Sequence, residues 1–288
     1  MARAAHRILA GIVAVAATTS PAFAGETVLA PATKWQVDWN DTSCTLSRAF
    51  GPQDDPLIIR FERFAPGNSF QFLLMGQVFR HTDHESRFSI AFGAGKPHIY
   101  DGKVLTGTVG ETMPTIFIPV SRLVDRKDKN DEHNFSITPA MEAAVRSITL
   151  RLAGKSLRLD TGPMNKPFAA LRKCTDNLVQ TWGLDPQAQA TGMRGPKPMT
   201  DPDTWLRSGD YPTAESVYGK QAIVNFRLMI DAQGKPTDCR IPRSYGGPRF
   251  DRQTCALLMD RARFEPALDA RGQPMASYYI NTVTWIMR

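Results

Sequence analysis

Short apolar segments and polar breaks alternate over the first half of the chain. Between residues 35 and 160, mostly apolar or alternating runs are separated by Gly, Pro, Asn and Asp. Runs of this length and spacing are typical of the strands of an antiparallel sandwich or barrel. We therefore expect a β-rich domain whose strands include residues 56–61, 69–75, 87–92, 115–120, 135–137 and 148–152.

Two segments of the same region carry helical signals. Thr138 followed by Pro139 is a typical helix start, so residues 140–146 are expected to form a short helix with Thr138 as its N-cap. From residue 164 to 182, large apolar residues recur at helical spacing, and Cys174 shares their face. The stripe predicts an amphipathic helix and consists of Met164, Phe168, Leu171, Leu178 and Trp182.

A polar stretch separates this region from the C-terminal part. Residues 184–210 contain four Pro and three Gly, which is typical of a stiff connection that holds no helix. Trp205 and Leu206 are the large apolar pair in its second half, and we expect them to pack on a neighbouring domain. The sequence thus predicts a β-rich domain, a linker and a small C-terminal domain, over residues 25–186, 187–210 and 211–288.

The C-terminal part switches between helical and strand periodicity. We expect a helix that Asp251 caps and that Pro266 ends. Around it, the pattern predicts a short helix from residue 211, a strand over residues 222–230 and a turn over 231–234. A second strand over residues 237–241, a break at 244–247 and a long last strand over 277–287 are also expected. The order α-β-β-α-β indicates a three-stranded antiparallel sheet with helices on one face. The whole chain is therefore expected to be α+β.

A series of short motifs runs through the same part in a fixed order. They are Tyr-Pro followed by Ala within residues 211–214, Ile-Asp-x-x-Gly at 230–234, Ser-x-Gly at 244–246, Phe-Asp at 250–251, Arg-Ala-Arg-Phe-Glu-Pro-Ala at 261–267 and Gly-x-Pro at 272–274. In their order and spacing, these motifs resemble the TonB C-terminal domain family. The resemblance covers about residues 205–288.

The resemblance implies a binding role. In that family, the domain belongs to an inner-membrane protein, and it joins a complex that uses the proton gradient to outer-membrane transporters. It adds the transporter's extended N-terminal segment to its own sheet, next to the last strand. The implied partner is a TonB-dependent outer-membrane transporter or another envelope protein. The partner-binding residues that we expect are Tyr278, Tyr279, Ile280, Asn281, Val283, Trp285, Arg261 and Arg263.

The residues themselves leave alternatives open. A hairpin with a long last strand leaves backbone groups unpaired at a sheet edge, and Tyr278, Tyr279 and Trp285 would offer stacking area to an added strand. The same aromatics could complete the core beneath the helices, although alternation lets only one face do so. Arg261 and Arg263 could equally serve as favourable charge at a helix C-terminus.

The chain also departs from the family pattern in three ways. We find no lasting anchor helix and no long spacer of Pro, Lys and Glu. Gln221 or Ala222 stands where Gly often opens the first strand. The resemblance therefore implies a fold and a mode of binding more than it implies energy transduction.

The first residues have the pattern of an export signal. Arg3 and Arg7 precede an apolar stretch over residues 8–17, and Ala-Phe-Ala at residues 22–24 fits a small-x-small cleavage site. The apolar stretch is roughly half of what a helix needs to cross a bilayer. We expect cleavage after Ala24, release into the periplasm of a Gram-negative bacterium and no stable membrane insertion. Retention of the segment as an anchor is the alternative.

Export decides how the four cysteines are interpreted. In an oxidising compartment they indicate two disulfides, for which three pairings are possible. Proximity along the chain and the domain division favour Cys44–Cys174 and Cys239–Cys255. A metal site is the rival interpretation, but the sequence has no Cys-x-x-Cys and its five His are scattered.

The basic excess lies in the C-terminal domain. From residue 211 onward there are 11 basic and 7 acidic residues, against 22 and 21 over residues 25–210. This excess indicates a solvated basic face or a surface for an acidic partner. Export argues against nucleic acid as the partner.

One cluster has a composition that suits metal binding or catalysis. His81, Asp83, His84 and Glu85 could hold an ion, but a polar loop also needs such residues. Elsewhere, Gly-Ala-Gly-Lys-Pro at residues 93–97 lacks the spacing of a phosphate loop, and no Gly-x-Ser-x-Gly occurs. We expect a non-catalytic periplasmic binding or adaptor protein with no cofactor and no metal. The alternative is an enzyme with a site around residues 81–85.

Overall fold

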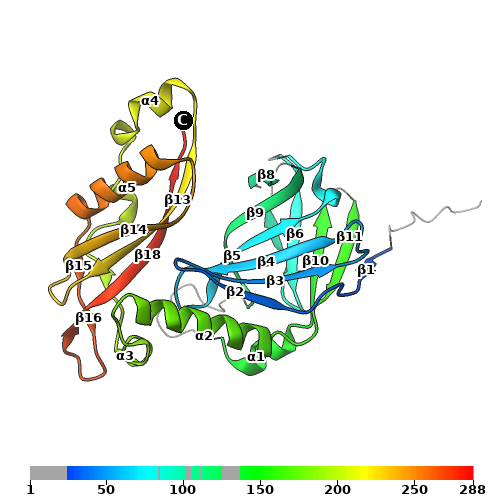
Figure 1. Ribbon diagram of the computed structural model, residues 1–288, viewed down its shortest axis with the longest axis horizontal. Coiled ribbons are helices and arrows are strands. Elements are labelled where there is room, and N and C mark those ends of the chain that lie inside the picture. The colour runs from blue at the N-terminus through cyan, green and yellow to red at the C-terminus, as the bar shows by residue number, and fades with distance from the viewer. Residues whose placement is uncertain are drawn as a thin grey trace, which may run out of the picture.

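The computed structural model describes residues 25–83, 85–100, 105–110, 112–124, 137–152 and 154–287. The expected signal segment, residues 1–24, lies outside the described residues. Figure 1 shows a larger N-terminal domain and a smaller C-terminal domain, with helix α2 running along the first toward the second.

The N-terminal domain is β-rich, as predicted. Its described strands form two sheets, in the orders β2-β3-β4-β5-β9-β8 and β1-β11-β10-β6-β7. Phe70 and Phe72 of the first sheet meet Phe92 of the second edge to face, so the core lies between the sheets. The strands are Thr27–Leu29 (β1), Gln36–Trp39 (β2), Cys44–Phe50 (β3), Leu57–Arg63 (β4), Ser69–Met75 (β5), Phe88–Phe92 (β6), His98–Tyr100 (β7), Leu105–Val109 (β8), Met113–Arg122 (β9), Ser147–Leu152 (β10) and Lys155–Asp160 (β11), with a 3-10 turn at Gln77–Phe79 (η1).

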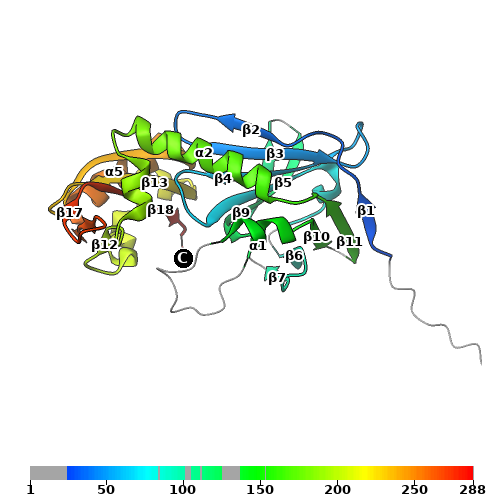
Figure 2. The same cartoon turned by 90° about the horizontal axis from the view of Figure 1, so that it is seen from below.

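Both helices predicted in this region are present. Helix α1 spans Pro139–Ala144, and its N-cap Thr138 accepts a hydrogen bond from the Met141 amide. Helix α2 spans Asn165–Thr181 and crosses the sheet that contains β3 (Figure 2). The disulfide Cys44–Cys174 joins it to that strand, as predicted. Its buried face adds Phe168, Leu171 and Leu178 to the core.

The segment between the two domains is more ordered than its Pro and Gly content suggests. Helix α3 spans Pro186–Thr191, so the expectation that no helix forms here is wrong. Asp185 caps its first turn by accepting from the Gln187 amide, and a Pro at the first helical position costs no hydrogen bond. Further on lie Lys197–Pro198 (β12), Pro202–Thr204 (η2) and Ser208–Asp210 (η3).

Trp205 fixes this segment to the C-terminal domain, which confirms that the apolar pair packs on a neighbour. Its side chain is 2% exposed and contacts the rings of Phe264 and Tyr279. Strand β12 pairs with β15, which spans Phe264–Glu265. Residues on both sides of the predicted boundary therefore share one apolar core.

The C-terminal domain has the predicted order of elements. Its main sheet, within the described residues, is antiparallel with the order β14-β13-β18. Helix α5 covers one face of it, where Leu258 packs with Phe226 and Leu228, and Cys239–Cys255 joins β14 to the helix, as predicted. The elements are Thr213–Val217 (α4), Ala222–Ile230 (β13), Pro236–Tyr245 (β14), Pro248–Arg261 (α5), Ala267–Leu268 (β16), Pro274–Met275 (β17) and Ser277–Trp285 (β18).

Several boundaries differ from the prediction. Helix α4 begins at Thr213, α5 ends at Arg261 well before Pro266, and β18 ends at Trp285. Helix α5 begins at Pro248 with Gly247 as its N-cap, so Asp251 lies in the first turn and is not the cap. Proline at the first position is already set for helical geometry, which starts the helix four residues earlier than expected. Strand β14 runs through the expected break to Tyr245, because Tyr245 still pairs with Ile223 of β13.

Candidate partner-binding site

The C-terminal sheet has two faces with different surroundings. Along β13, Phe226 and Leu228 point toward α5, whereas the alternate residues Asn225 and Arg227 point to the opposite face. That second face is turned toward the N-terminal domain, since its residues contact that domain directly. The site therefore lies where the two domains meet.

Polar pairs connect this second face to the larger sheet of the N-terminal domain. Gln71 of β5 donates through Nε2 to Oδ1 of Asn225 at 2.6 Å, and both side chains are buried. Arg243 of β14 forms an ion pair with Glu62 of β4 at 2.5 Å, and Glu62 is 2% exposed. Buried polar groups are stable only when paired, so these contacts fix how the two domains sit.

The end of α2 supports the same face. Trp182 packs edge to face on Tyr278 of β18, with ring centroids 5.0 Å apart. The guanidinium of Arg227 lies 4.3 Å from the centroid of the Trp182 ring, a cation–π contact. Burial, with a smaller contribution from Asp176, raises the pKa of Tyr278 to about 12. The phenol is therefore uncharged at neutral pH.

The last strand has one open edge. In the part of the chain that the structure describes, β18 pairs with β13 and with no other strand. The amide of Thr282 donates to Oδ1 of Asn281 at 2.8 Å, and Nδ2 of Asn281 donates to the Tyr279 hydroxyl at 3.0 Å. Successive residues of an antiparallel strand direct their backbone groups to opposite edges. The side-chain bond indicates that the Thr282 amide belongs to the edge turned away from β13.

Helix α3 closes one end of this edge. Gln189 donates through Nε2 to the carbonyl of Ala276 at 2.9 Å and accepts from the Ser277 hydroxyl at 2.6 Å. The start of β18 is thus held by the segment that connects the domains, and the remainder of the strand runs past it toward Trp285.

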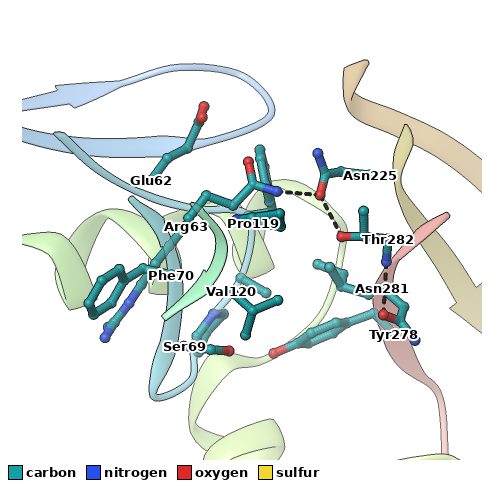
Figure 3. A pocket seen from close by; sticks show the side chains of 15 residues that line it. Glu62, Arg63, Ser69, Phe70, Pro119, Val120, Asn225, Tyr278, Asn281 and Thr282 are labelled. Carbon is teal, nitrogen blue, oxygen red and sulfur yellow. Dashed lines mark hydrogen bonds between the residues drawn. The ribbon is translucent and has the colours of Figure 1, made fainter. Parts of the chain in front are cut away.

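A cleft of about 270 Å³ lies beside β18, between the two domains (Figure 3). Its charged lining residues are Glu62 and Arg63, and both are buried. Glu62 is paired with Arg243, and the Arg63 guanidinium lies 5.0 Å from the centroid of the Phe168 ring. Burial and the nearby Arg172 lower the pKa of Arg63 to about 10. The remaining lining is uncharged and includes Ser69, Gln71, Pro119 and Val120 from one domain and Tyr278, Ile280, Asn281 and Thr282 from the other.

The predicted partner-binding residues of β18 divide between the two faces. Tyr278, Ile280 and Asn281 line the cleft. Tyr279 and Val283 pack in the core beneath α5. Trp285 is also buried there, and its indole N–H donates to the Thr254 hydroxyl at 3.0 Å.

The two arginines lie at the end of α5, and neither lines the cleft. Arg261 donates to both carboxylate oxygens of Asp210, at 2.6 and 2.9 Å, and to the Trp205 carbonyl at 2.9 Å. These hydrogen bonds lower the pKa of Asp210. Arg263 donates to the Ala262 carbonyl at 2.7 Å.

Sequence reasoning missed the residues that bring the domains together. Glu62, Gln71 and Asn225 each lie in a mostly apolar strand, and all are buried. A polar residue at such a position needs a partner, and this is the signal that could have identified it. The partner itself is far away in the sequence and could not be read from local periodicity.

The cluster at residues 81–85 forms a polar turn as far as it is described. His81, Asp83 and Glu85 are exposed, and His84 lies outside the described residues. Oδ1 of Asp83 accepts from the Glu85 amide at 3.1 Å and from the Ser86 hydroxyl at 2.8 Å. No group of three or more His, Cys, Asp or Glu among the described residues could hold a metal ion.

Comparison with protein families identifies the C-terminal domain. Residues 208–287 match the family described as Gram-negative bacterial TonB protein C-terminal. This confirms the resemblance over that part of the chain, and the family is one of non-catalytic domains from the Gram-negative envelope that interact with outer-membrane proteins. No curated protein matches the chain. Among the described helices, none is long and apolar enough to cross a membrane.

Proposed function

We propose that this protein is a non-catalytic periplasmic adaptor that binds an extended segment of an envelope protein along the open edge of β18. The observation that carries the proposal is the edge itself: over the described residues, Ser277–Trp285 pairs on one side only. Backbone groups left unpaired at a sheet edge are what strand addition requires.

The geometry favours β18 over the other edge of the same sheet. Its register with β13 runs without a shift from Ser277 to Trp285. The pairing of β13 with β14 is shifted at two places, and such bulges twist an edge away from further pairing. A flat, continuous edge accepts a guest strand more readily.

The partner we propose is a TonB-dependent outer-membrane transporter or another envelope protein. The family match of residues 208–287 supports this class, because the matched family serves energy transduction or transport in the Gram-negative envelope. The pairing of all four cysteines fits an oxidising compartment. Cleavage of the export signal after Ala24 belongs to the same proposal.

Proline substitutions at two adjacent residues of β18 test the edge. A decapeptide display library is first selected against the protein, and dissociation constants of the selected peptides are then measured. Thr282→Pro removes an N–H from the open edge and should weaken binding at least about tenfold, the equivalent of roughly 1.4 kcal/mol. Thr282→Val keeps the amide and is the matched control. Asn281→Pro should instead disturb the pairing with β13 and lower the melting temperature.

A second pair of substitutions tests the alternative surface. Neutralising Arg261 and Arg263 to Gln should reduce only the salt-sensitive part of binding, because exposed charges act at long range and are screened. The proposal fails if the folded Thr282→Pro variant binds normally while the double Arg variant loses all binding. The basic end of α5 would then be the site.

A further inference from the structure

We infer that the N-terminal domain contacts the side chains of the guest strand and so selects which guests bind. The guest is an extended peptide whose cleft-facing side chains are uncharged and mostly apolar. The inference rests on strand addition at β18, proposed above. It assigns the N-terminal domain a role in specificity, through the wall that Pro119 and Val120 of β9 form across the cleft from β18.

The alternation of a β-strand determines which guest side chains reach this wall. On β18, Tyr278, Ile280 and Thr282 belong to the face that lines the cleft, whereas Tyr279 belongs to the face beneath α5. A strand added beside β18 continues the same sheet, so every second guest residue points to the cleft side. Those that lie beside Pro119 and Val120 meet the N-terminal domain, and the residues between them do not.

The chemistry of the wall sets the preference. Val120 is an apolar side chain that is 56% exposed, and it lines the cleft (Figure 3), as does Ile280 of β18. Glu62 is paired with Arg243, and Arg63 is 4% exposed with its guanidinium against the Phe168 ring. A charged guest side chain would lose water here without gaining a counter-charge. An apolar side chain would cover Val120 and Ile280.

The size and rigidity of the cleft fit peptide side chains. Its volume of about 270 Å³ lies just below the roughly 300–1,000 Å³ that pockets for separate small molecules occupy. The wall is held at a fixed position relative to β18, because three contacts join the domains. They are the hydrogen bond between Gln71 and Asn225, the ion pair of Glu62 with Arg243, and the packing of Trp182 on Tyr278. A fixed wall beside the open edge selects guest peptides by the type of their side chains. The edge alone selects only for an extended backbone.

Charge introduced at Val120 tests the inference. The decapeptide library is selected separately against the wild type, Val120→Glu and Val120→Lys. The wild type should enrich a two-residue period in which Asp, Glu, Lys and Arg are depleted at least about fivefold at alternate positions. Val120→Glu should admit Lys and Arg at one of those positions, and Val120→Lys should admit Asp and Glu there. The matched control is Val28→Glu, because Val28 is 60% exposed on β1 and does not line the cleft.

The possible outcomes separate this inference from the proposed function. If both Val120 variants select the same peptides as the wild type while Thr282→Pro still abolishes their binding, the edge binds peptides and the N-terminal domain does not contribute to their selection. That result overturns the inference and leaves the proposed function standing. If the selected peptides bind the folded Thr282→Pro variant normally, or if no peptide is selected, both are overturned.

Discussion

The side chain of Asn281 lies along the open edge of β18, where its Oδ1 accepts the Thr282 amide at 2.8 Å. Because a guest strand needs that same N–H, the Asn281 side chain competes with the guest. Asn281→Ala should therefore raise the affinity for the selected peptides by roughly two- to tenfold, the equivalent of one hydrogen bond of about 0.5–1.5 kcal/mol. Calorimetric titration measures the change. A weaker affinity in the folded Ala variant would show that Asn281 contacts the guest directly.

A second residue-scale prediction concerns pH. Because Arg261 lowers the pKa of Asp210 in the folded protein, this pair stabilises the fold above the unfolded pKa of about 3.9 and loses its effect as the pH falls through the lower folded value. Asp210→Asn should thus be less stable than the wild type at pH 7. The difference between the two should shrink as the pH falls below 4. Chemical unfolding across this pH range would contradict the account if the difference stayed constant.

At the scale of single residues, the candidate partner-binding residues can be predicted from the sequence, but the residues that they contact cannot. Tyr278, Tyr279 and Trp285 stand out by type and by position on the last strand. Alternation divides them between two faces, yet only the three-dimensional placement of Trp182 explains why Tyr278 is covered from the N-terminal side. Arg261 was recognisable as a cation at a helix end. Its bidentate pairing with Asp210, 51 residues earlier, has no local signature.

The disulfides join elements, and their expected effects differ. Cys44–Cys174 closes a loop with a sequence separation of 130 residues and ties α2 to β3, whereas Cys239–Cys255 has a separation of 16 and ties α5 to β14. On the chain-entropy account, the first should contribute nearly 5 kcal/mol and the second about 3 kcal/mol. Unfolding free energies of the two double Cys→Ala variants measure this. An equal or reversed order would indicate strain or residual unfolded structure.

Elements with strong periodicity were predictable, and those that depend on Pro or on distant pairing were not. The bounds of β13 agree with the prediction because its apolar residues alternate without a gap. Helix α3 differs from the expectation because Pro186, a breaker inside a helix, is well suited to the first helical turn. The extension of β14 to Tyr245 depends on its pairing with Ile223, which propensity does not encode.

The arrangement of the whole molecule depends on buried polar pairs between domains. Removing Arg243 leaves the carboxylate of Glu62 buried without its partner, which costs about 3–5 kcal/mol when both groups are fully buried. The Arg243 side chain is 39% exposed, so we expect Arg243→Met to cost less, about 2 kcal/mol. The double variant Glu62→Gln, Arg243→Met should recover part of the loss. Additive effects in this double-mutant cycle would contradict the coupling of the domains.

At this scale the sequence predicted a two-domain α+β chain but not the cleft. The cleft exists because Gln71 meets Asn225, a pair separated by 154 residues, and neither residue belongs to a recognisable motif. The family match over residues 208–287 identifies the C-terminal domain and says nothing about the wall that faces it. The specificity we infer for the N-terminal domain therefore depends on the assembled structure.

Amide hydrogen exchange tests strand addition at β18 most directly. Exchange rates are measured for the protein alone and with a saturating library-selected decapeptide. A guest strand on this edge should slow exchange at alternate residues of β18, including Thr282, and leave β14 and the end of α5 near Arg261 unchanged. Protection that develops along β14 or around Arg261, with β18 unchanged, would contradict the account.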